Sequence, residues 1–238
     1  MLRGLLLLAC LLRRPVPRGT YGWFSAQVKA SAFAALVLAL VVPAGVVEGP
    51  LRIVVLGDSL SAGYGLAADA TFPVRLEHAL TAKGLAVEVA NAGVSGDTAS
   101  GGLSRLEWAV PSGTDAVILE LGANDMLRGV DPEVTQGALS EIVRRLGGRR
   151  ITVLLAGMRA APNLGADYAR RFDAIYPRLA AENGLLLYPF FLDGVAAQAA
   201  FNQGDGMHPT AAGVDEIVAR ILPKVEEMVS RARENRGK

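Results

Sequence analysis

Short, continuous apolar runs constrain the fold of this chain most strongly, because they alternate with amphipathic stretches from residue 51 onward. The run Ile53-Val54-Val55-Leu56 contains no polar residue, which is typical of a strand that is covered on both faces. Strands of this kind occur in parallel sheets, whose crossover connections are usually helices. The runs predict five strands: Arg52–Leu56, Val87–Ala90, Ala116–Leu121, Ile151–Ala156 and Leu185–Tyr188.

Amphipathic stretches between these runs predict the helices of the crossovers. Asp131 followed by Pro132 indicates a helix start, because Asp caps helices and Pro suits the first helical turn. Five βα units with right-handed crossovers indicate an α/β fold, a three-layer α/β/α sandwich around a five-stranded parallel sheet in the flavodoxin-like order 2-1-3-4-5. We predict helices over Phe72–Lys83, Leu103–Trp108, Pro132–Leu146 and Tyr168–Glu182, and a last helix after Pro209 that continues through Met228.

Length and charge indicate one domain with appendages at both ends. In the 238 residues we expect an N-terminal extension over 1–50, a folded domain over 51–230 and a charged tail over 231–238. The domain and tail together hold 19 basic and 22 acidic residues, and this mildly acidic balance gives no case for nucleic-acid binding. Cys10 is the single cysteine, which excludes a disulfide framework or a cysteine-based zinc site in the domain.

The N-terminal extension carries the pattern of a secretory signal. Ala32–Val42 is an apolar run of eleven residues that follows Lys29, and eleven residues are too few to span a bilayer. Val42-Pro43-Ala44 offers small residues of the kind that a signal peptidase accepts. We expect cleavage near Ala44 and release into the periplasm or the medium as a monomer without a membrane span. The alternative is an uncleaved N-terminal anchor in the inner membrane.

Four short polar motifs fall after predicted strands or before the last helix. The second and third strands flank the first in the predicted order, and ligands of open α/β sheets bind beyond the carboxyl ends of the strands. We therefore expect the loops that carry these motifs to converge on one crevice. The motifs are Gly57-Asp58-Ser59-Leu60, Asn91-Ala92-Gly93, Gly122-Ala123-Asn124-Asp125 and Asp205-Gly206-Met207-His208-Pro209.

The residue types in these motifs fit nucleophilic catalysis by a serine. A serine hydroxyl needs a neighbouring base, and His208 can supply it for Ser59. Asp205, three residues earlier, can accept a hydrogen bond from the imidazole and fix its tautomer. The backbone N–H groups of Ser59 and Gly93 and the amide of Asn124 would then stabilise a tetrahedral oxyanion.

At these residues the chain resembles the SGNH, or GDSL, hydrolase superfamily, over about residues 51–228. The stretch from Gly57 to Tyr64, with Ser95-Gly96-Asp97-Thr98 and Leu127-Arg128-Gly129, is most similar to the bacterial periplasmic arylesterase and thioesterase/lysophospholipase branch. The resemblance implies hydrolysis of small acyl esters and thioesters, including aryl esters and lysophospholipids, with no cofactor and no metal. It implies Ser59 as nucleophile, His208 as base and Asp205 as the residue that orients the base.

The acyl pocket and two alternative functions complete these expectations. We expect Met126, Leu127 and Leu164 to bind substrate, at walls that determine the acyl length. A carbohydrate O-acetyl esterase of the same superfamily is the nearer alternative. The more remote one is a nucleotide-binding module, suggested by the Gly63-Tyr64-Gly65-Leu66-Ala67-Ala68 string with Glu88 further along. That string lies too far beyond Gly57, since the first glycine of a dinucleotide-binding turn follows its strand directly.

Overall fold

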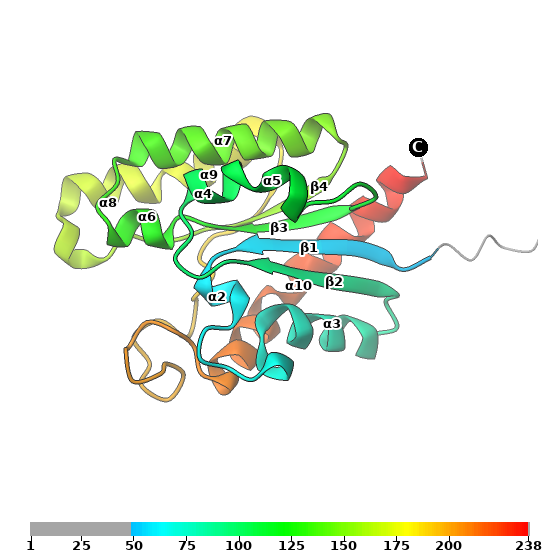
Figure 1. The fold of residues 1–238 in the computed structure, drawn as a ribbon, viewed down its shortest axis with the longest axis horizontal. Coiled ribbons are helices and arrows are strands. Elements are labelled where there is room, and N and C mark those ends of the chain that lie inside the picture. The colour runs from blue at the N-terminus through cyan, green and yellow to red at the C-terminus, as the bar shows by residue number, and fades with distance from the viewer. Residues whose placement is uncertain (1–48, 238) are drawn as a thin grey trace, which may run out of the picture. The chain divides into compact units, whose positions relative to one another are not determined.

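The computed structural model describes residues 49–237, so the predicted signal sequence lies outside the described residues. Within this range the chain forms a five-stranded parallel sheet in the order β2-β1-β3-β4-β5 (Figure 1). The predicted fold class and strand order are therefore confirmed. The strands are β1 (Leu51–Gly57), β2 (Val87–Gly93), β3 (Ala116–Glu120), β4 (Thr152–Ala156) and β5 (Leu186–Tyr188).

Helices cover both faces of this sheet. Figure 1 shows α4, α5, α7 and α9 on one side and α3 with the long α10 on the other, which gives three layers. Among residues 49–237, no helix combines the length and the apolar composition that crossing a bilayer requires. The helices are α2 (Ser59–Ala62), α3 (Phe72–Ala82), α4 (Ala99–Ser104), α5 (Leu106–Ala109), α6 (Ala123–Leu127), α7 (Pro132–Gly148), α8 (Ala166–Asp173), α9 (Ile175–Asn183) and α10 (Ala211–Arg236), with 3-10 turns η1 (Ala68–Ala70) and η2 (Pro162–Leu164).

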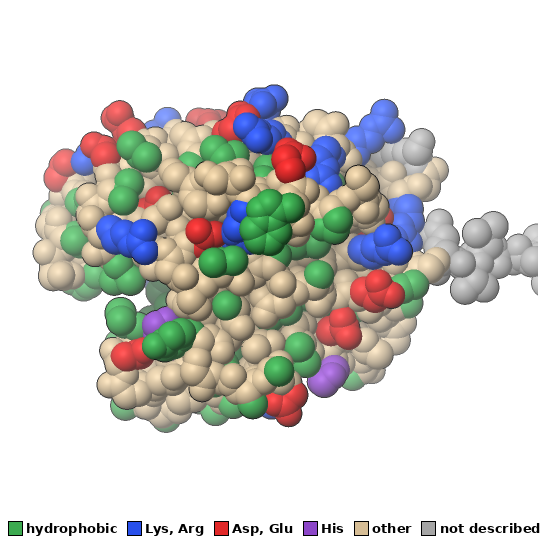
Figure 2. All heavy atoms as spheres, viewed as in Figure 1, with side chains coloured by type: hydrophobic (Ala, Val, Ile, Leu, Met, Phe, Trp, Pro, Cys, Tyr) green, Lys and Arg blue, Asp and Glu red, His purple; other side chains and the backbone are tan. Residues whose placement is uncertain are grey.

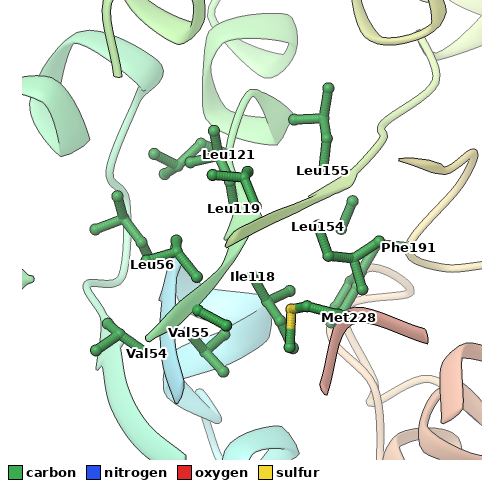
Figure 3. Close-up of a cluster of buried hydrophobic side chains, with 14 of the residues drawn as sticks. Val54, Val55, Leu56, Ile118, Leu119, Leu121, Leu154, Leu155, Phe191 and Met228 are labelled. Atoms are coloured by element: carbon green, nitrogen blue, oxygen red, sulfur yellow. The ribbon is translucent and has the colours of Figure 1, made fainter. Parts of the chain in front are cut away.

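The strand register builds one hydrophobic layer on each face of the sheet. The register places Val55, Ile118 and Leu154 side by side on β1, β3 and β4. Because successive side chains of a strand point to opposite faces, these three point to the same face of the sheet. Figure 3 shows this row facing Met228 of α10 and Phe191. Every residue of β3 and β4 is buried, because helices cover both faces, which explains the continuous apolar runs of the sequence.

Two of the predicted helices are each divided into two helices in the structure. The helix predicted over Tyr168–Glu182 is divided into α8 and α9, since Pro177 has no N–H to donate to the carbonyl of Asp173. The helix predicted over Leu103–Trp108 is two short helices, α4 and α5, which meet at Arg105.

The charged tail predicted after residue 230 is not separate from the domain. It continues α10 as far as Arg236, Ala232 within it is buried, and Arg236 donates hydrogen bonds to Asp115. The alternation of apolar and charged residues in 231–236 thus belongs to a helix that packs on the domain.

Candidate active site

The proposed nucleophile lies on a tight turn between β1 and α2. Ser59 is the first residue of α2, and Asp58 caps the helix by accepting the Leu60 N–H on Oδ1 at 3.0 Å. Gly57 leaves no space for a side chain, since a Cβ there would collide with Ser61 and Glu120. The turn therefore holds Ser59 at the carboxyl end of β1, where it lines a cleft.

Ser59, His208 and Asp205 are brought together as predicted from the sequence. Nε2 of His208 lies 2.9 Å from Oγ of Ser59, and Nδ1 lies 2.6 Å from Oδ2 of Asp205. Oδ1 of Asp205 accepts the backbone N–H groups of Met207 at 2.9 Å and His208 at 3.0 Å. The His208 N–H, then the Met207 N–H and the imidazole, lower the pKa of Asp205 to about 2, so this carboxylate stays charged and acts as an acceptor.

An aromatic ring lies against the imidazole. The ring centroids of Tyr64 and His208 are 4.6 Å apart with the planes tilted by 36°, although 55% of the Tyr64 surface is exposed. Nε2 of Gln203 donates to the carbonyls of Tyr64 at 2.7 Å and Pro209 at 2.9 Å. Gln203 thus joins the segment after α2 to the segment that carries the histidine.

The side chain of Asn124 reaches the same cleft from the first turn of α6. Its Nδ2 donates to Oδ2 of Asp58 at 3.0 Å, across the space between β1 and β3. The amide NH2 has two hydrogens, and this bond uses one of them. The other is available to a ligand, as the sequence analysis expects of an oxyanion donor.

Gly93 does not occupy the place that the sequence analysis assigned to it. Its N–H already donates to Oδ1 of Asn91 at 2.9 Å, and Gly93 is not among the residues that line the cleft. A glycine is needed there because a Cβ would collide with Ala62 and Asp58. Gly96, with a φ of +83°, lines the cleft instead, and its N–H makes no hydrogen bond within the described residues. The structure therefore replaces Gly93 by Gly96 as the available backbone donor.

Two buried carboxyl groups lie beneath the nucleophile. Oε2 of Glu120 accepts the Ser61 hydroxyl at 2.6 Å and the Asp58 N–H at 3.3 Å. Burial, followed by the nearby charge of Asp58, raises the pKa of Glu120 well above its ordinary value. Burial also raises the pKa of Asp58 from 3.8 to about 6, against the hydrogen bonds from Leu60 and Asn124, which lower it. Burial thus disfavours the ionised form of both carboxyl groups.

The cleft beside Ser59 has a volume of about 500 Å³ and mostly apolar walls. Figure 2 shows hydrophobic side chains gathered around a hollow at the left of the molecule, beside a histidine. Met126 and Leu127 line the cleft as predicted, whereas Leu164 does not, and Ala161 before η2 does so in its place. No Asp, Glu, Lys or Arg occurs among the described lining residues. Sequence reasoning missed Leu60, Tyr64, Leu192, Ala196, Ala197 and Met207 as lining residues.

Three of these six missed residues lie in or beside motif stretches, and three do not. Leu60 is the last residue of the first motif. Met207 stands next to His208, and Tyr64 lies within the stretch that carried the family resemblance. The other three, Leu192, Ala196 and Ala197, lie in the loop after β5, which carries no motif. Only the three-dimensional structure therefore identifies them as walls of the cleft.

A parallel α/β sheet with a serine, a histidine and an aspartate joined at the carboxyl ends of its strands is the arrangement found in serine hydrolases. The chain belongs to the GDSL-like lipase/acylhydrolase family, whose model matches residues 55–215, and it is an enzyme that acts on ester bonds.

Two curated relatives and one solved structure are similar over most of the domain. An arylesterase of Vibrio mimicus is 39% identical over 177 residues, which are 73% of this chain and 88% of that protein. The thioesterase 1/protease 1/lysophospholipase L1 of Escherichia coli is 39% identical over 158 residues, 66% of this chain and 74% of that protein. The crystal structure of AlinE4, an SGNH-hydrolase family esterase, has a TM-score of 0.64 at 45% identity and covers 75% of this chain and 96% of its own.

Proposed function

We propose that the protein hydrolyses carboxylic esters and thioesters through Ser59, His208 and Asp205. The observation that carries this proposal is the continuous hydrogen-bonded chain from Oγ of Ser59 through both imidazole nitrogens to the Asp205 carboxylate, at 2.9 and 2.6 Å. An ionised Asp205 holds Nδ1 protonated and leaves Nε2 as the base that faces the serine hydroxyl.

The reaction proceeds in two transfers of the acyl group. Nε2 of His208 takes the Ser59 proton while Oγ bonds to the carbonyl carbon, and the imidazolium then gives this proton to the departing alcohol or thiol. A water molecule next loses a proton to Nε2 and attacks the carbonyl carbon of the acyl-serine. The imidazolium returns this proton to Oγ as the bond between Oγ and the acyl carbon breaks, which releases the acid and restores the hydroxyl. The N–H groups of Ser59 and Gly96 and the free hydrogen of Asn124 Nδ2 stabilise the oxyanion in both steps.

The walls of the cleft support an acyl chain as the bound group. Apolar lining without charged side chains favours hydrocarbon, whereas the sugar of a carbohydrate O-acetyl ester needs several polar partners. The names of the two curated relatives, an arylesterase and a thioesterase/lysophospholipase, support aryl esters, acyl thioesters and lysophospholipids as substrates.

A panel of p-nitrophenyl esters from acetyl to palmitoyl, together with an acyl-CoA and a lysophospholipid, tests this proposal. We expect turnover without added metal, and Ser59→Ala and His208→Ala should each remove nearly all of it. Ser104→Ala and His78→Ala are the matched controls, since Ser104 is exposed on α4 and bonds its own helix, and His78 lies outside the cleft on α3. Turnover retained by either cleft variant, or lost in EDTA and restored by zinc, would contradict the mechanism.

We also propose that the protein is exported, on the basis of the apolar run Ala32–Val42 and the small residues at 42–44. Expression of the full chain in a Gram-negative host should yield periplasmic protein whose N-terminus lies near Gly45. Protein that keeps its N-terminus and sediments with the inner membrane would favour the anchored alternative instead.

A further inference from the structure

Arg105, between α4 and α5, is a buried arginine that bonds three separate segments. Only 6% of its surface is exposed, which is rare for arginine unless it is paired. Nη2 donates to the carbonyl of Gly57 at 2.9 Å, Nη1 donates to the carbonyl of Ala92 at 2.7 Å, and Nε donates to Oδ2 of Asp97 at 2.5 Å. One guanidinium thus holds two strand ends and one loop.

These three acceptors lie next to residues of the proposed site. Gly57 is the last residue of β1, two positions before Ser59. Ala92 in β2 and Asp97 stand on either side of the loop that contains Gly96. The guanidinium therefore fixes both ends of the loop that carries the backbone donor, and it fixes that loop to the strand that carries the nucleophile.

We propose that Arg105 is a positioning residue that sets the distance between the backbone N–H groups of Ser59 and Gly96, so that both donate to the same substrate oxygen. This inference rests on the proposed esterase function. Donors of an oxyanion hole act only where negative charge develops, so a small shift of this loop lowers the rate of the chemical step more than it affects substrate binding.

The geometry of the site requires an arginine. Its planar fork presents several N–H donors in fixed directions, whereas a lysine offers one flexible ammonium group that cannot reach three acceptors at once. Asp97, whose side chain is 14% exposed, neutralises the buried charge, and the ring of Trp108 lies 5.8 Å from the guanidinium carbon. Arg105→Lys therefore preserves the charge opposite Asp97 and removes the fork.

Arg149 provides a matched control within the same chain. Its Nη2 donates to the carbonyls of Val110 at 2.6 Å and Pro111 at 2.9 Å, and none of these residues lines the cleft. Arg149→Lys thus removes the same kind of arginine–backbone bond at a remote position, where it affects stability alone.

The test measures kcat, KM and thermal unfolding for the wild type, Arg105→Lys and Arg149→Lys on one p-nitrophenyl ester. We expect Arg105→Lys to lower kcat by about tenfold to a hundredfold with KM nearly unchanged, as a small misplacement of catalytic groups does. Arg149→Lys should leave kcat unchanged. In Arg105→Ala, added guanidinium should restore part of kcat, and sodium at the same ionic strength should not.

Other outcomes overturn the inference in distinguishable ways. If Arg105→Lys keeps the wild-type kcat, or changes KM alone, Arg105 does not position the donors although the esterase function stands. If the wild type hydrolyses no ester, the proposed function fails and this inference fails with it. If Arg105→Lys does not fold, Asp97→Asn weakens the Nε contact and removes the charge opposite the guanidinium, and an unchanged kcat in that variant overturns the proposal.

Discussion

Oδ2 of Asp58 accepts a hydrogen bond from Nδ2 of Asn124 at 3.0 Å, so the residue before the nucleophile orients the amide of the opposite loop. A carboxylate has only acceptors, and it therefore forces the NH2 group of Asn124, rather than its oxygen, toward the inside of the site. The other oxygen of Asp58 caps α2 through the Leu60 N–H. One buried side chain thus aligns the nucleophile helix with a proposed oxyanion donor.

Exchange of Asp58 for asparagine tests this alignment. We expect Asp58→Asn to lower kcat by about tenfold with little change in KM, because a neutral amide binds Asn124 more weakly and permits it to rotate. A double-mutant cycle with Asn124→Ala measures the coupling. When Asn124 is absent, Asp58→Asn should have little further effect, and additive losses would show that Asp58 acts by another route.

The pH dependence of stability reports the ionisation of Asp58. Burial raises its pKa from 3.8 to about 6, so the folded protein holds this proton more tightly than the unfolded chain does. The contribution of Asp58 to the free energy of unfolding is therefore largest below pH 3.8 and is lost as the pH rises to about 6. Relative to Asp58→Asn, the wild type should lose about 2–3 kcal/mol of unfolding free energy across that window. Urea unfolding at several pH values measures this difference, and a constant difference would contradict the burial effect.

Asp205 should orient His208 while Ser59 loses its proton, whereas Asn124 should act when negative charge develops on the carbonyl oxygen. An added small carboxylate such as formate distinguishes the two roles, because it can replace the side chain of Asp205 only. Asp205→Ala should lower kcat by about 10³–10⁴, since the imidazole loses its orienting charge. Formate should recover part of this rate, because the Asp205 side chain is 32% exposed and its position is open to solvent. Asn124→Ala should lower kcat by about 10²–10³ without recovery in formate. A change in KM alone for Asn124→Ala would make it a binding residue.

Glu120 should contribute to stability as the acceptor of two buried hydrogen bonds. Glu120→Gln keeps an oxygen for the Ser61 hydroxyl and the Asp58 N–H, so we expect it to change the unfolding free energy by less than about 1 kcal/mol. Glu120→Leu leaves both donors buried without a partner, at a cost of about 1–3 kcal/mol for each. Equal destabilisation by the two variants in urea unfolding would contradict the role of Glu120 as an acceptor.

Much of the fold was predictable because local sequence and chain handedness decide it. Continuous apolar runs such as Ile53-Val54-Val55-Leu56 specify strands that are covered on both faces, and right-handed crossovers leave few possible orders for five of them. The same order puts Ser59 and Asn124 on neighbouring loops, so most of the proposed site followed from four motifs. His208 and Asp205 are three residues apart, and their contact needs little more than one turn of chain.

The sequence by itself thus determined the sheet, its order and the serine, histidine and aspartate that meet beyond it. Only the tertiary structure decided which glycine faces the cleft, because Gly93 and Gly96 are close in the chain and their N–H groups differ in partners. It also decided that Arg105 bonds the ends of β1 and β2 and that the loop after β5 lines the cleft. These contacts join segments far apart in sequence, and their geometry depends on packing that no local pattern encodes.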